Sequence, residues 1–104
     1  MAKLKLVANP TFSADVPIPV AGGEPVNVKM TFKHRTKDAL DEFIKTRAEK
    51  SDAESFMAMV DGWDLEDPLN AENVETLLQN YIGTALATYR VYIDQLVQAR
   101  TKNS

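Results

Sequence analysis

Few residues in this chain of 104 could carry enzymatic or metal chemistry, because it has a single histidine and no cysteine. The absence of cysteine excludes disulfides, thiolate metal sites and cysteine nucleophiles. His34 could act as a general base only beside a nucleophile and an orienting acid, and no nucleophile motif surrounds any Ser or Thr. The sequence therefore predicts a protein that is not an enzyme, has no cofactor and carries His34 at its surface.

A short acidic segment raises the question of a calcium site, since it contains Asp61, Asp64, Glu66 and Asp67. An EF-hand loop places oxygen ligands at alternate positions, a glycine at its centre and a glutamate at its twelfth position. Here the glycine comes second and a tryptophan occupies the next ligand position. The segment does not fit that pattern, so we expect no metal site.

The formal net charge of −3 is unevenly distributed along the chain. Residues 1–50 carry nine basic and six acidic side chains, residues 51–89 carry eight acidic and no basic ones, and residues 90–104 carry three basic and one acidic. One interpretation is a solvated acidic face. The other is a dipolar surface that steers a charged partner or joins copies of the chain head to tail, which predicts a homo-oligomer.

The basic residues form one patch, at Lys29, Lys33, His34, Arg35 and Lys37. Nucleic-acid binding usually needs a basic domain with a recognition motif and aromatic side chains among the bases. This chain is acidic overall, and Phe32, the aromatic residue beside the patch, falls on the predicted core face. We expect no nucleic-acid partner, although a small DNA-binding regulator remains an alternative.

The pattern of apolar residues predicts a single α+β domain over residues 1–104. Apolar side chains alternate with polar ones over residues 11–20 and again over 26–33, on either side of a Gly22-Gly23 turn, which is typical of a β-hairpin with one buried face. Pro17 and Pro19 place the first strand at a sheet edge. Leu4 and Leu6 suggest a short third strand. No apolar run is long enough to cross a membrane.

The helical part follows over residues 36–104, after a hairpin part over 1–35. Thr36 can cap a helix over 37–49, and the capping-box pattern at residues 51–54 predicts a second helix over about 52–61 that ends at Gly62. Residues 62–68 are expected to be a loop, and Asn70 to cap a third helix. Apolar spacings of three and four predict a long last helix over about 81–101, with a kink near Gly83.

Aromatic and apolar residues near the last helix are the main candidates for partner contact. Trp63 either covers the helical core as a lid or anchors a partner, because tryptophan is enriched at binding hot spots. The same two interpretations apply to Tyr81 and Tyr92. The residues predicted to bind a partner are Lys33, Arg35, Trp63, Tyr81, Tyr89, Tyr92, Ile93 and Leu96.

An ordered set of short motifs resembles the phage tail assembly chaperone family over about residues 12–103. The motifs are Phe32-Lys33-His34-Arg35-Thr36, Leu40-Asp41-Glu42-Phe43, Val60-Asp61-Gly62-Trp63-Asp64-Leu65, Asn73-Val74-Glu75-Thr76-Leu77-Leu78, Tyr81, Tyr89 and Arg100-Thr101-Lys102-Asn103. Their order and spacing carry the resemblance. One departure is Ile82-Gly83, where many relatives are expected to have a proline.

The resemblance implies a non-structural protein of long-tailed phages, made in the cytoplasm of the infected bacterium and absent from the mature virion. Such chaperones bind the tape measure protein and help to recruit tail tube subunits, and many also exist as a longer product of ribosomal frameshifting. The alternatives to this function are a structural or head–tail joining protein of the phage and the DNA-binding regulator.

Overall fold

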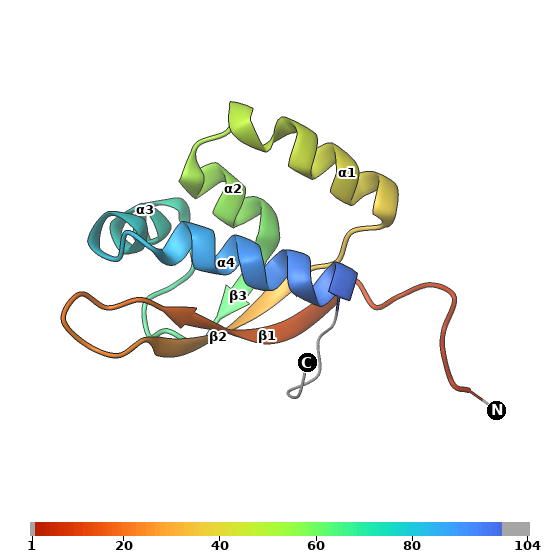
Figure 1. Cartoon of the computed structure of the whole chain (residues 1–104), viewed down its shortest axis with the longest axis horizontal. Helices are drawn as coiled ribbons and strands as arrows, with labels where there is room; N and C mark the ends of the chain where they lie inside the picture. The colour runs from red at the N-terminus through yellow and green to blue at the C-terminus, as the bar shows by residue number, and fades with distance from the viewer. Residues whose placement is uncertain (1, 99–104) are drawn as a thin grey trace.

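The computed structural model describes residues 2–98 as a small antiparallel sheet covered on one face by helices (Figure 1). Its elements, in chain order, are β1 (Thr11–Ile18), β2 (Val26–Lys33), α1 (Lys37–Thr46), a 3-10 turn (Arg47–Glu49), α2 (Asp52–Met59), β3 (Val60–Trp63), α3 (Ala71–Asn80), α4 (Thr84–Ile93) and a π-helical turn (Asp94–Gln98). The predicted α+β class, with an N-terminal hairpin and a helical part, is confirmed.

The sheet has the order β1-β2-β3, so β1 lies at an edge, as its prolines predict. The hairpin register runs from Thr11 opposite Lys33 to Ile18 opposite Val26. The even-numbered positions of β2 from Val28 to Phe32 are buried under the helices, and the alternate positions lie on the other face. Leu4 and Leu6 form no strand, so that expectation is wrong.

The predicted helix starts are confirmed by their caps. The Thr36 hydroxyl accepts a hydrogen bond from the backbone N–H of Ala39, and Ser51 and Glu54 form the complete capping box of α2. The Asn70 side chain accepts from the N–H of Asn73 at the start of α3. Each cap satisfies a backbone donor that the first helical turn leaves unpaired.

The end of the second helix differs from the sequence expectation. Helix α2 stops at Met59, and β3 takes over directly, so Gly62 lies inside a strand and is not the predicted C-cap. The strand pairs with β2 across an irregularity between Thr31 and Phe32. Because β3 is four residues long and itself carries the bulge, with Asp61 as the extra residue, it has too little alternation to be recognised in the sequence, which explains the error.

The last helix begins three residues later than predicted, after a break at the expected place. A Cβ built on Gly83 would lie 2.8 Å from Pro19 Cγ, so glycine lets α4 approach the end of β1 closely. After Ile93 the helix continues as a π turn to residue 98. The predicted end at residue 101 lies outside the described residues.

Tyr92 of α4 lies at the centre of the core and is completely buried. Its ring stacks on Phe12 of β1 with 6.0 Å between centroids, and it also contacts the rings of Phe32 and Phe43 at 5.5 and 5.9 Å. These aromatic residues come from both hairpin strands and from α1. The Tyr92 side chain therefore joins the hairpin to the helical layer.

Candidate partner-binding surfaces

Two of the predicted contact residues, Lys33 and Arg35, bind the C-terminal end of α2. Lys33 Nζ donates to the carbonyl of Met57 at 3.2 Å, and Arg35 Nη1 donates to the carbonyl of Ala58 at 2.8 Å. The last carbonyls of a helix have no partner within the helix and carry a partial negative charge. Both cations therefore cap α2, a role that the sequence analysis did not foresee.

Arg35 also ties α2 to α4 through Tyr92. Its Nη1 donates to the Tyr92 hydroxyl at 2.9 Å, and the hydroxyl donates to the carbonyl of Lys33 at 2.7 Å. The guanidinium lies 4.5 Å from the centre of the Phe43 ring, which adds a cation–π contact. Because Tyr92 is fully buried in this network, its side chain has no surface to offer a partner in the folded chain.

Trp63 packs as a lid on the helical core, as one of the two interpretations predicts. Its ring meets Phe56 of α2 edge-on with 6.0 Å between centroids. The indole N–H donates to the carbonyl of Asp67 at 2.7 Å, which folds the following loop back onto the ring. Part of the ring stays exposed and forms one wall of a groove.

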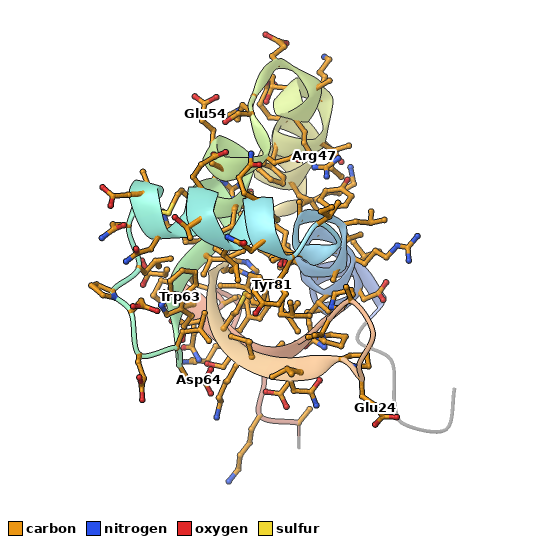
Figure 2. The ribbon with its side chains drawn as sticks, turned by 90° about the vertical axis from the view of Figure 1, so that its left-hand side faces the viewer. Glu24, Arg47, Glu54, Trp63, Asp64 and Tyr81 are labelled. Atoms are coloured by element: carbon orange, nitrogen blue, oxygen red, sulfur yellow. The ribbon has the colours of Figure 1, made fainter. Side chains whose placement is uncertain are left out.

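We name this hollow the Tyr81 groove, because Tyr81 lines each of its adjoining parts. One part, of about 400 Å³, lies between Trp63 and α3. The other, of about 160 Å³, has an apolar lining contributed by the hairpin and the helical layer: Ile18, Val20, Val26, Val28, Leu65, Leu77 and Tyr81. In Figure 2, Tyr81 lies between the helices above and the hairpin below, with Trp63 to one side.

A second hollow of about 490 Å³, the α1–α4 groove, lies where β2 joins α1 and the π turn passes α1. It is lined by His34, Arg35, Thr36, Lys37, Leu40, Asp41, Leu96 and Val97. The groove has an apolar floor with basic residues on one side. The predicted contact residues Arg35 and Leu96 both line it and therefore lie close together. His34 is half-buried there, and its backbone N–H donates to the carbonyl of Pro10.

The outer face of α4 adds an apolar stripe beside the α1–α4 groove. Leu86 and Val97 are exposed and Ile93 is half-buried, and their spacings of seven and four place them on one side of the helix. Tyr89 lies under Arg47, whose guanidinium is 3.7 Å from the ring centre. The sequence analysis named Ile93 but missed Leu86 and Val97, although their spacing from Ile93 was a readable signal.

The eight acidic side chains of residues 51–89 are all exposed at the surface. Asp64 fastens the loop after β3 to the sheet, because its carboxylate accepts from the N–H of Lys29 and its own N–H donates to the Lys29 carbonyl. The Ser51 N–H lowers the pKa of Glu54 below its ordinary value of 4.5. Within residues 2–98, no cluster of three or more acidic or histidine side chains could hold a metal ion.

None of the described helices is long and apolar enough to cross a membrane. The sequence matches the model of a family described as phage tail assembly chaperone over residues 1–103. No curated protein and no solved structure matches the chain. The match covers nearly the whole chain and confirms the resemblance on which the sequence analysis relied.

Proposed function

Because the chain belongs to the phage tail assembly chaperone family, we propose that it binds the tape measure protein and helps to recruit tail tube subunits around it. In this proposal it acts by non-covalent binding, without catalysis or a cofactor. It works in the cytoplasm of the infected bacterium and is left out of the mature virion. Its targets, the tape measure and tube proteins, are components of the growing tail.

The observation that best supports this proposal is the α4 stripe together with the α1–α4 groove. The stripe extends over the twelve residues 86–97, or about 16 Å of helix, and presents Leu86, Ile93 and Val97 in a row. An amphipathic helix is recognised by such a surface through apolar anchors spaced three or four residues apart. A helix with an acidic flank would also match Lys37 at the edge of the groove.

The structure offers less support for the alternative of a DNA-binding regulator. Lys33 and Arg35, two members of the basic patch, direct hydrogen bonds to carbonyls of α2. These contacts draw the cations toward the protein. Retention on DNA that falls steeply with salt would nevertheless favour the regulator over the chaperone.

Co-expression with the tape measure protein tests the proposal. The chain is expected to keep the tape measure protein in the soluble fraction and to co-purify with it. Replacement of Leu86 and Val97 by Glu should abolish both effects, because it removes two exposed apolar contacts and adds charge that repels an acidic flank. The control Ile44→Glu changes an exposed apolar residue that lies outside the α4 stripe and lines neither groove, and it should behave like the parent chain.

Two further results would contradict the proposal. If the parent chain fails to solubilise the tape measure protein, tape measure binding is wrong. If mass spectrometry finds the chain in purified virions, the head–tail joining or structural alternative replaces the chaperone. If the α4 variant and the control lose binding equally, binding does not depend specifically on the α4 stripe and the binding site lies elsewhere.

A further inference from the structure

The N-terminal residues form an exposed arm that contacts little of the domain. Residues 2–9 have no regular secondary structure. Leu4 and Val7 are 87% and 82% exposed, and Leu6 is fully exposed. The arm is attached at Pro10, whose carbonyl accepts the His34 N–H at 2.9 Å. Three neighbouring apolar side chains in water are costly for a monomer and are typical of a docking segment.

The Tyr81 groove, at the turn end of the hairpin, has the chemistry that would receive this arm. Its smaller hollow is apolar and measures about 160 Å³, and a cavity of about 150 Å³ is large enough for a benzene-sized apolar group. Val26, in its lining, is 55% exposed, and Ile82, which lines an adjoining hollow on the other side of Tyr81, is 88% exposed. The groove can therefore take a leucine side chain and gains apolar contact at its edge.

The charges of the arm and the groove are opposite. The arm carries Lys3 and Lys5 and no acid. The two segments that line the groove, residues 18–28 and 63–83, carry no Lys or Arg, and all their acidic side chains are exposed: Glu24, Asp64, Glu66, Asp67, Glu72 and Glu75. Opposite charges around an apolar contact orient the two surfaces and speed their encounter.

The arm is too short to place both of its leucines in the groove of its own chain. It leaves the domain at the end of β1 opposite the turn (Figure 1), whereas the groove lies at the turn end, where Ile18, Val20 and Val26 line it. Leu6, five residues before Thr11, reaches back at most about 18 Å, and Leu4, seven residues before it, at most about 25 Å. The seven-residue step from Thr11 to Ile18 covers about 23 Å of strand, so Leu4 reaches the edge of the groove only in a fully extended chain and Leu6 does not reach it. The arm of a second copy is not limited by this length, because it can approach the groove from outside.

We propose that the arm at Leu4 and Leu6 of one copy docks in the Tyr81 groove of the next copy. Because arm and groove lie at opposite ends of the domain, the contact is heterologous and repeats from copy to copy, giving a row or a ring. This interface joins copies of the chain and uses neither Leu86 nor Val97. It therefore stands or falls independently of tape measure binding.

Sedimentation velocity on the purified chain over a dilution series, at about 50 and 500 mM salt, tests the interface. The average mass should rise with concentration beyond that of a dimer, and high salt should weaken association without abolishing it, because salt screens the charges but leaves the apolar contact. An arm variant, Leu4→Glu with Leu6→Glu, and a groove variant, Val26→Lys with Ile82→Lys, should each stay monomeric.

A mixture of the two variants gives the sharpest result. The arm variant keeps an intact groove and the groove variant keeps an intact arm, so the mixture should form a one-to-one complex that grows no further. The control Ile44→Lys with Leu86→Lys, which alters exposed apolar residues outside both surfaces, should associate like the parent. Circular dichroism verifies that each variant is folded.

Three outcomes would overturn the proposal. The first is a parent chain that is monomeric at every concentration in low salt. The second is an association that the arm variant retains, which would place the interface elsewhere. The third is a mixture of folded variants that stays monomeric. None of these outcomes bears on whether the chain solubilises the tape measure protein.

Discussion

Replacing Tyr92 by Phe tests whether the buried hydroxyl network holds the helical layer on the hairpin. The substitution keeps the ring and its contacts with Phe12 and Phe32 but removes two hydrogen bonds, one from Arg35 and one to the Lys33 carbonyl. A neutral hydrogen bond contributes about 0.5–1.5 kcal/mol, and one with a charged group about 1.5–3 kcal/mol. Because Arg35 is only partly buried, the contribution of its hydrogen bond to Tyr92 falls at the lower end of the range for charged groups.

We therefore expect Tyr92→Phe to lower the free energy of unfolding by about 2–3 kcal/mol. For a domain of this size that corresponds to a fall in Tm of roughly 10–20 °C. Urea denaturation followed by circular dichroism measures the change, and an unchanged m-value shows that the unfolded state is unaffected. The matched control is Tyr81→Phe, which removes the hydroxyl of an exposed tyrosine and should cost less than about 0.5 kcal/mol.

A double-mutant cycle with Arg35→Met separates the pair from its surroundings. If the hydrogen bond between Arg35 and Tyr92 matters, the two substitutions should be less than additive by about 1–2 kcal/mol. The reasoning is refuted if Tyr92→Phe is no more costly than Tyr81→Phe. Full additivity in the cycle would instead assign the loss to the Lys33 carbonyl alone.

Three other substitutions test the packing and the caps. Phe32→Ala should cost about 3–5 kcal/mol in urea denaturation because the side chain is completely buried, and a loss below roughly 1 kcal/mol would contradict that burial. Gly83→Ala should cost about 1–3 kcal/mol, since its Cβ would clash with Pro19 Cγ; a second change, Pro19→Ala, should restore most of the loss. Folding lowers the pKa of Glu54 through the Ser51 N–H, so its carboxylate stabilises the fold above its ordinary pKa and stops doing so as the pH falls through the folded value. Glu54→Gln should therefore be less stable than the parent near pH 7 and approach it near pH 3, and an equal difference at both pH values would exclude this linkage.

Patterns within short segments of the sequence were sufficient to predict the hairpin and the helix starts. Alternation in residues 26–33 depends only on the two-residue period of a strand, so it identified the buried face of β2 correctly at Val28, Met30 and Phe32, whereas Val26 at the start of the strand is exposed. The caps at Thr36, Ser51 and Asn70 are contacts between residues three apart, and such contacts are readable because both partners lie in one short segment. The family resemblance was readable for a similar reason, since it depends on the order of short motifs.

The partners of charged and aromatic side chains were not readable in the same way. Lys33 and Arg35 looked like a free basic patch, but the fold places the end of α2 beside them, 23 or more residues away in sequence. Tyr92 looked like a residue at the edge of a helix, and three aromatic side chains from other elements enclose it. A pattern within a short segment of the sequence cannot predict such contacts, because they join residues from distant segments.

The sequence by itself determined the class of fold, the order of its elements, most helix starts and the family. Each of these follows from interactions within a few residues or from the period of the apolar positions. The tertiary structure alone decided the pairing of β3, the capping of α2 by Lys33 and Arg35, the burial of Tyr92 and the position of the Tyr81 groove at the far end of the hairpin from the arm. These features bring together residues from distant segments, and their energies depend on desolvation and distance, which exist only once the chain is packed.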